Sequence, residues 1–204
     1  LLRDAGAAVN QAAVDGATPL SVACQEGHVE CAIVRLLLEA SAAVNQAKDD
    51  GATPLFIACQ KGHLEIVRLL LEVSAAVNQA DAEGATPLFM ACQEGHVECA
   101  RLLLEASAAT DQASDDGATP LYIACQNGHL ECAQLLRDAG ADINQAMNDG
   151  TTPLFIASQK GHLEIARLLL EAGAAVNQAR NDGATPLFIA CQKGHLDIAR
   201  LLLE

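Results

Sequence analysis

Residues 51–63 read GATPLFIACQKGH, and the same thirteen residues return at 183–195. The two copies begin 132 residues apart, which is four times 33. A period of that length is typical of chains that stack many copies of one small structural unit. The spacing of this motif along the chain therefore decides which fold we expect.

The centre of the motif, Thr-Pro-Leu, occurs six times, with gaps of 35, 33, 33, 33 and 33 residues. A Gly precedes each Thr by two residues, and a His follows it by ten residues. These positions hold all 6 histidines of the protein. We therefore predict one continuous solenoid domain. Its boundaries are the end of a truncated N-terminal repeat at 1–12, repeat 1 with a two-residue insertion at 13–47, repeat 2 at 48–80, repeat 3 at 81–113, repeat 4 at 114–146, repeat 5 at 147–179 and an incomplete repeat 6 at 180–204.

Composition favours thin layers of small side chains over a large aromatic core. Of the 204 residues, 51% are hydrophobic but only 2% are aromatic. One copy is too short to bury a core alone, so neighbouring copies must supply it. The longest apolar stretch, 31–44, is broken by Arg35 and Glu39, and it is shorter than the roughly 20 residues that cross a bilayer. We expect no membrane segment, and we interpret the start at Leu1, in what reads as a helix end, as that of a fragment.

Repeat 2 predicts a tight turn, a helix, a short turn, a second helix and an extended hairpin arm. Gly51 suits the turn, Thr53 can cap the first helix, and Pro54 fits its first position, where no amide hydrogen is needed. Gly62 ends this helix, and an apolar run with helical spacing follows it.

Repeat 1 is two residues longer, with GHVECAIVRLLLE where repeat 2 has GHLEIVRLLLE. Two extra helical residues would rotate all later side chains by about 200° and place Arg35 in the core. We therefore predict that the register is restored before Arg35, by a longer turn or a bulge near 29–33.

The full pattern is Gly-x-Thr-Pro-Leu, then Ala, Gly-His, a leucine triplet and Val-Asn, at a period of 33. It resembles the ankyrin repeat, over essentially the whole chain. One departure recurs, because Phe, Tyr or Ser follows Thr-Pro-Leu where the family usually has His. The resemblance implies an all-α solenoid of stacked antiparallel helix pairs with projecting β-hairpin loops. It also implies that hairpin asparagines such as Asn45 and Asn144 are either hydroxylation targets or backbone-bonded turn residues.

Ankyrin repeats generally bind other proteins and carry no chemistry of their own, so the resemblance implies a protein-interaction scaffold that is not an enzyme. In the family, binding residues lie at the hairpin tips and on the exposed side of the first helix. Carried over by position, the tips are Val14, Asp15, Asp49, Asp50, Ala82, Glu83, Asp115, Asp116, Asn148, Asp149, Asn181 and Asp182. The first-helix positions are Glu26, Lys61, Glu94, Asn127, Lys160 and Lys193, each preceded by a Gln.

An acidic residue precedes the turn Gly in every repeat, which predicts a row of six carboxylates along one edge. This row has two interpretations: a surface for a basic partner, or ordinary turn chemistry of Asp before Gly. The uniform Gln position favours a partner that is itself repetitive or is read by the few variable residues, or else a recently multiplied array whose specificity lies outside this fragment. A structural alternative is a spacer or a self-stacking rod, engineered or excised, whose fragments associate end to end.

Other kinds of site are disfavoured. Five cysteines share one repeat position with Ser158, and three share another with Ile, as expected of buried packing residues: Cys24, Cys59, Cys92, Cys125 and Cys191, then Cys31, Cys99 and Cys132. Equivalent positions about 10 Å apart are too distant for disulfides or a shared zinc. Free thiols indicate a reducing, cytoplasmic location. A Cys-His pair repeated five times argues against a catalytic nucleophile, and we expect no cofactor. A net charge of −14 argues against nucleic acid as a partner.

Overall fold

The computed structural model describes residues 6–27 and 31–204, and every regular element among these residues is an α-helix. The helices follow one another in pairs, within two compact units, Leu1–Ala108 and Ala109–Glu204. Unit 1 contains α1 (Pro19–Glu26), α2 (Cys31–Glu39), α3 (Pro54–Lys61), α4 (Leu64–Glu72), α5 (Pro87–Glu94) and α6 (Val97–Glu105). Unit 2 contains α7 (Pro120–Asn127), α8 (Leu130–Asp138), α9 (Pro153–Lys160), α10 (Leu163–Glu171), α11 (Pro186–Lys193) and α12 (Leu196–Leu203). The predicted all-α class of stacked helix pairs is confirmed.

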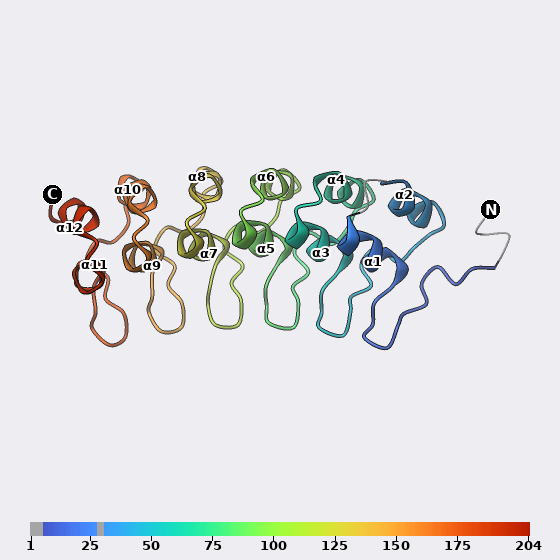
Figure 1. Cartoon of the computed structure of the whole chain (residues 1–204), viewed down its shortest axis with the longest axis horizontal. Coiled ribbons are helices and arrows are strands. Elements are labelled where there is room, and N and C mark those ends of the chain that lie inside the picture. Colours follow the sequence, from blue (N-terminus) through green and yellow to red (C-terminus); the bar gives the residue numbers. More distant parts are fainter. Residues whose placement is uncertain (1–5, 28–30) are drawn as a thin grey trace. The chain divides into compact units, whose positions relative to one another are not determined.

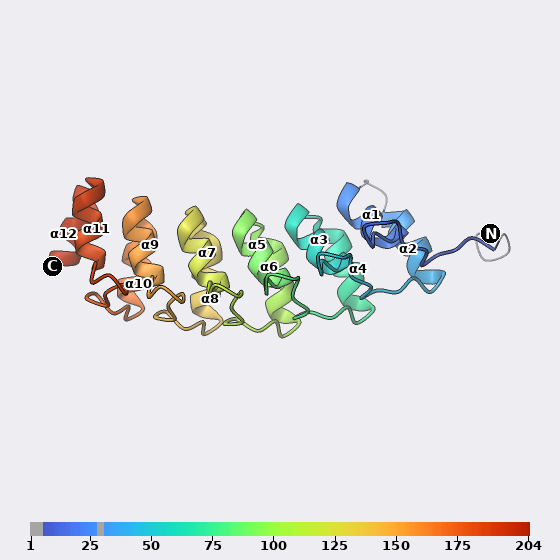
Figure 2. The same cartoon turned by 90° about the horizontal axis from the view of Figure 1, so that it is seen from below.

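Within each unit, helices of the same kind lie side by side. In unit 1, α3 contacts α1 and α5, while α4 contacts α2 and α6. In unit 2, α9 contacts α7 and α11, while α10 contacts α8 and α12. Each unit therefore has one row formed by the first helices of its pairs and one row formed by the second helices (Figures 1 and 2).

The loops that connect the pairs have a hairpin shape and extend from one side of each unit (Figure 1). Backbone hydrogen bonds close each loop, as where the Lys48 amide donates to the Ala52 carbonyl at 3.0 Å. A further bond joins neighbouring tips, since the Asp49 amide donates to the Asp15 carbonyl at 3.1 Å. The described residues of these loops contain turns and no strand, so the expected hairpins are loops without a β-ladder.

The first helices begin and end as the sequence predicts. The Thr53 hydroxyl accepts a hydrogen bond from the Phe56 amide at 3.1 Å, and Pro54 occupies the first helical position. This satisfies an amide that would otherwise lack a partner at the start of α3. Gly62 ends the helix with a left-handed φ of 71°, which favours glycine.

The two-residue insertion in repeat 1 is absorbed before Arg35, as predicted. Val34 and Leu37 are buried and Arg35 is exposed, which is the pattern of the equivalent residues 33 positions later in α4. The predicted turn or bulge near 29–33 falls partly on residues 28–30, outside the described residues.

Neighbouring repeats are joined by polar contacts that recur along each unit. Nε2 of the His63 ring, in repeat 2, donates a hydrogen bond to the Gln25 carbonyl of α1, in repeat 1, at 3.4 Å. The Asn45 side chain accepts a hydrogen bond from the Ala76 amide at 2.8 Å, and Asn144 accepts from the Ala175 amide at 2.8 Å. These two asparagines are therefore backbone-bonded residues that couple one repeat to the next.

Small and aliphatic side chains fill the core, and most described cysteines lie there. Cys24, Cys59, Cys92, Cys99, Cys125 and Cys132 are buried. The prediction is wrong for Cys191, which is exposed on α11. Burial raises the pKa of the Cys24 thiol to about 12 and that of Cys59 well above its usual range. Buried neutral thiols of this kind are poor nucleophiles.

Candidate functional site

All eighteen side chains that the sequence analysis selected for partner binding are exposed. Twelve of them lie at the loop tips and six are the last residues of the first helices, from Glu26 in α1 to Lys193 in α11. The loop tips and helix ends belong to two compact units, so each unit is described by itself.

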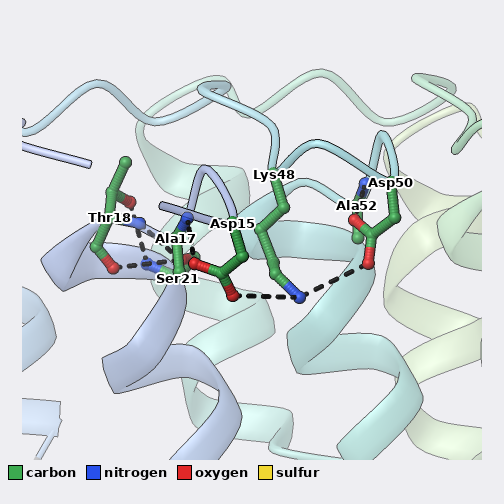
Figure 3. A network of polar contacts seen from close by, with 7 residues as sticks. All are labelled: Asp15, Ala17, Thr18, Ser21, Lys48, Asp50 and Ala52. Atoms are coloured by element: carbon green, nitrogen blue, oxygen red, sulfur yellow. Dashed lines mark hydrogen bonds and ion pairs between the residues drawn. The ribbon is translucent and has the colours of Figure 1, made fainter. Parts of the chain in front are cut away.

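Most carboxylates that precede the turn Gly hold the loop in shape. Oδ1 of Asp15 accepts a hydrogen bond from the Ala17 amide at 3.1 Å, and Oδ1 of Asp50 accepts one from the Ala52 amide at 3.0 Å (Figure 3). In unit 2, Asp116, Asp149 and Asp182 each accept a hydrogen bond from the amide two residues later. In Asp15, Asp50 and Asp182 one carboxylate oxygen serves the turn, and the other, Oδ2, pairs with a basic side chain.

Repeat 3 has a different arrangement. Glu83 stands before the turn Gly, but Oδ1 of Asp81 accepts the hydrogen bonds, from the Glu83 amide at 3.0 Å and the Ala85 amide at 2.9 Å. No hydrogen bond or ion pair joins the Glu83 carboxylate to the described part of the chain. Asp81 therefore stabilises the turn, while the exposed carboxylate of Glu83 remains available to a ligand.

A lysine neutralises part of the row of carboxylates in unit 1. Nζ of Lys48 lies 3.3 Å from Oδ2 of Asp50 and 4.0 Å from Oδ2 of Asp15, so it bridges two loop tips (Figure 3). The hydrogen bond from the Ala52 amide, with a smaller effect of Lys48, lowers the pKa of Asp50. Asp50 is therefore ionised at neutral pH.

Unit 1 also has a concavity of about 440 Å³ between the first helices and the loop tips. Its apolar lining comes from Phe56 and Ile57 of α3 and from Phe89 and Met90 of α5. Its polar lining is supplied by the glutamines near the ends of three first helices and by loop-tip side chains: Gln25, Gln60, Gln93, Lys48, Asp50, Asp81 and Glu83. Of the residues selected from the sequence, Asp50, Ala82 and Glu83 line this concavity, whereas Glu26, Lys61 and Glu94 do not.

In unit 2, Arg180 stands three residues before the turn Gly of repeat 6, the position that Lys48 and Asp81 hold in unit 1. The Arg180 guanidinium lies over the Phe155 ring, 5.2 Å from its centre, and its Nε donates to Oδ1 of Asp182 at 3.0 Å. The hydrogen bond from Arg180 is the main cause that lowers the pKa of Asp182 to about 2. Hydrogen bonds from Thr151, followed by the positive charge of Arg180, lower the pKa of Asp149.

The negative field of the loop tips also reaches a neighbouring phenol. Burial, followed by the charges of Asp149 and Asp116, raises the pKa of Tyr122 to about 12. The phenol therefore stays neutral at physiological pH.

The family model for ankyrin repeats (three copies) matches residues 1–81, 73–147 and 139–204. The chain belongs to the ankyrin-repeat family. Ankyrin repeats are in general protein–protein interaction modules and non-enzymatic scaffolds. No curated protein matches the chain.

The ankyrin pattern alone did not reveal two of the concavity's charged residues. Lys48 and Asp81 stand three residues before the turn Gly, a position outside the family's binding residues carried over above. The signal was present in the sequence, because this position varies more than its neighbours: Ala13, Lys48, Asp81, Ser114, Met147 and Arg180. A change of charge at one fixed repeat position indicates a side chain that is not needed for stacking.

The Cys-His pair of repeat 2 has a structural explanation in this ankyrin array. Cys59 and His63, four residues apart, serve separate purposes, since the thiol is buried and the imidazole contacts the Gln25 carbonyl. Among the described residues, no three His, Cys, Asp or Glu side chains are placed to hold a metal ion.

No helix among the described residues has the length and apolar character to cross a bilayer.

Proposed function

We propose that this ankyrin-repeat chain is a non-catalytic scaffold that binds a protein partner through its loop tips and the concave side of its first helices. The concavity of unit 1 is the observation that carries the proposal. It brings carboxylates, carboxamides and apolar side chains together around one concavity, whose volume is about 440 Å³. Surfaces that combine an apolar floor with a few polar groups are typical of binding sites.

The charge of the chain supports a basic partner. The chain carries 26 acidic and 12 basic residues, and the single lysine in the concavity is already paired with Asp15 and Asp50. A basic segment of a partner protein would therefore be steered toward this edge and bound there. Within each unit, the loop-tip residues and the last residues of the first helices are proposed to extend the surface.

The buried thiols are consistent with an intracellular role. The buried thiols have no disulfide partners among the described residues, and free cysteines persist in a reducing environment. We propose a cytoplasmic location on this ground.

The repeat boundaries from 13–47 to 180–204 remain predictions, because helix bounds do not mark where one repeat ends.

Selection from a random peptide display library tests the proposal. The intact chain is compared with a groove variant that carries Gln25→Ala, Gln60→Ala and Glu83→Gln, and with a control that carries Glu72→Gln and Glu105→Gln. The control residues are exposed on the second helices and do not line the concavity. We expect peptides that bind the intact chain and the control but not the groove variant, with all three proteins showing equal melting temperatures. Peptides that bind all three equally, or an empty selection, would contradict the proposed surface.

One observation favours the second candidate, a spacer or self-stacking rod. Several large apolar side chains are exposed on the helix pairs α1–α2 and α11–α12: Val22, Ile33, Leu36, Phe188, Leu196 and Leu203. Exposed apolar patches commonly mark surfaces that associate with other chains. Measuring the mass of the chain against concentration distinguishes this candidate from a monomeric scaffold.

A further inference from the structure

We propose that the concavity of unit 1 accepts an arginine side chain of the partner, with its guanidinium over the Phe56 ring and beside the carboxylates of repeat 3. This inference rests on the proposed function and names the chemical group that the surface recognises. Unit 2 supplies the main argument, because an arginine of the chain itself already occupies the equivalent place there.

The Phe56 region of unit 1 and the Phe155 region of unit 2 are three repeats, or 99 residues, apart in the sequence. Phe56 corresponds to Phe155, and the residues at the loop tip of repeat 3 correspond to those of repeat 6. Repeat 6 has Arg180 where repeat 3 has Asp81. The side chain that covers the phenylalanine in unit 2 is thus replaced in unit 1 by a short carboxylate that is turned toward its own loop.

The geometry around Arg180 shows how a guanidinium fits this environment. Its carbon lies 5.2 Å from the centre of the Phe155 ring, within the range of a cation–π contact. Its NH groups reach the carboxylate of Asp182, which stands before the turn Gly. Asp149, on the neighbouring loop, is also close enough for its charge to be felt.

Unit 1 contains the same set of partners without the arginine. Phe56, Asp50 and Glu83 all line the concavity, and they correspond by position to Phe155, Asp149 and Asp182. The Glu83 carboxylate makes no hydrogen bond or ion pair with the described residues, in contrast to the carboxylate of Asp182. Phe56 is 5% exposed, against 1% for Phe155 beneath Arg180. A carboxylate that has no partner and a phenylalanine that lines the same concavity match the requirements of a guanidinium ligand.

Lysine in the partner would be a weaker ligand. Nζ of Lys48 satisfies Asp50 as a point charge, without lying over a ring. A planar guanidinium can lie flat on an aromatic face and donate two hydrogen bonds to one carboxylate, whereas an ammonium cannot do both. We therefore expect the site to distinguish arginine from lysine.

The glutamines place the rest of the partner's chain. Among the described residues, no hydrogen bond engages the carboxamides of Gln25 and Gln60, and both side chains line the same concavity. A carboxamide both donates and accepts, so it suits the unpaired backbone groups of an extended segment. The arginine would then extend from such a segment toward Glu83.

A reciprocal exchange of loop-tip residues tests the site. The variant Asp81→Arg with Glu83→Asp gives repeat 3 the residues of repeat 6, so its own arginine should cover Phe56. The reverse variant, Arg180→Asp with Asp182→Glu, should uncover Phe155. Both exchanges use residues that the chain already holds at these positions, which favours correct folding. Glu72→Arg and Arg200→Glu change the net charge equally at exposed sites outside the concavity and serve as controls.

The probe is the peptide acetyl-Gly-Pro-Ala-Ala-Arg-Ala-Ala-Pro-Gly-amide, titrated into the isotope-labelled intact chain and followed by NMR. Matched peptides carry lysine or the neutral analogue citrulline in place of arginine. We expect the arginine peptide to bind at least tenfold more tightly than the citrulline peptide and severalfold more tightly than the lysine peptide. The first exchange should remove one binding site, the reverse exchange should add one, and the controls should change neither number.

Equal binding of arginine and citrulline peptides would overturn the inference, as would unchanged binding after the first exchange. Equal effects of the first exchange and Glu72→Arg would also overturn it, because net charge would then explain the binding. The library selection of the previous section keeps the two proposals distinct. Groove-dependent peptides that lack arginine would refute the arginine site while supporting the binding surface.

Discussion

At the residue scale, the length of an acidic side chain decides what it does at a loop tip. Aspartate before the turn Gly reaches the amide two residues later, as Asp50 does at 3.0 Å. Glutamate is one methylene longer and leaves this role to Asp81 in repeat 3. The turn interpretation of the row of carboxylates is confirmed for the five aspartates, whereas the binding interpretation stays a prediction that rests on Glu83.

We predict that Asp81→Ala lowers the free energy of unfolding by roughly 1–2 kcal/mol, since two amides lose a charged acceptor. Adding Glu83→Asp to this variant should restore most of the loss, because an aspartate would again stand before the turn Gly. Urea denaturation of the two variants and the parent chain measures both changes. A double variant no more stable than Asp81→Ala would show that the position of the carboxylate does not matter.

The low pKa of Asp149 predicts how stability depends on pH. Its hydrogen bonds from Thr151, and then Arg180, hold the pKa below the ordinary aspartate value of about 3.9. Because the folded-state pKa is lower than the unfolded one, this contribution is present above about pH 3.9 and is lost as the pH falls through the folded-state pKa. Asp149→Asn should therefore flatten the decline of the urea midpoint below pH 4.

The exposed residue Glu171 on α10 provides the comparison for this experiment. Glu171→Gln removes a carboxylate from the same unit without touching a loop tip. Parallel pH curves for Asp149→Asn and the parent chain would refute the assignment of acid sensitivity to Asp149.

At the element scale, the glycine that ends a first helix can have two functions, as Gly128 does at the end of α7. Gly128 adopts a left-handed φ of 82°, and a Cβ built there would lie 2.7 Å from Cε1 of His162 in the next repeat. The glycine thus ends α7 and also leaves room for the imidazole, whose Nε2 donates to the Gln126 carbonyl at 3.2 Å. Helix termination and repeat stacking depend on the same residue.

Comparison of two glycine variants separates these functions. Gly194 ends α11 with a similar φ of 78°, but a Cβ there would meet nothing within 4 Å. Gly194→Ala should cost only the left-handed strain, about 1–2 kcal/mol. Gly128→Ala should cost at least about 1 kcal/mol more, because the imidazole must move and its hydrogen bond is lost. Equal losses in thermal or urea unfolding would show that the histidine contact contributes nothing.

The sequence predicted the helices well because their start and end signals are local. Thr53, Pro54 and Gly62 occupy the positions that propensity and capping assign to them. The binding surface was less predictable, since it depends on side chains from different repeats. The role of Asp81 as the acceptor for its own turn is local, but the ankyrin pattern does not include its position. The exposure of Cys191 follows from tertiary surroundings that no single repeat specifies.

At the scale of the whole molecule, repetition creates an internal set of comparisons. Each unit repeats the same backbone positions with different side chains, so one repeat shows what another would do after substitution. Arg180 over Phe155 is such a case, and it carries more information about Phe56 than the family pattern alone. The uniform stacking residues keep the backbone constant, and the variable loop-tip residues change the surface on it.

Exposed apolar side chains predict that the mass of the chain rises with concentration. Val22, Ile33 and Leu36 are 47%, 44% and 51% exposed, whereas the equivalent Ile57, Ile66 and Leu69 are 4%, 3% and 8% exposed. In repeat 2 these positions contact a neighbouring repeat, so in repeat 1 they present a surface suited to another helix pair. Association through two different surfaces can continue from molecule to molecule rather than close as a dimer.

Sedimentation equilibrium over two orders of magnitude in concentration measures this association. Val22→Lys with Leu36→Lys should keep the chain monomeric, because charge on this surface cannot be buried without a partner. Val73→Lys is the control, since Val73 is 44% exposed at the end of α4 but lies away from that surface. A constant monomer mass for the parent chain would refute the self-stacking rod and leave the protein-binding scaffold. A rise in mass that Val73→Lys abolishes equally would show that the surface on α1 and α2 is not the one that associates.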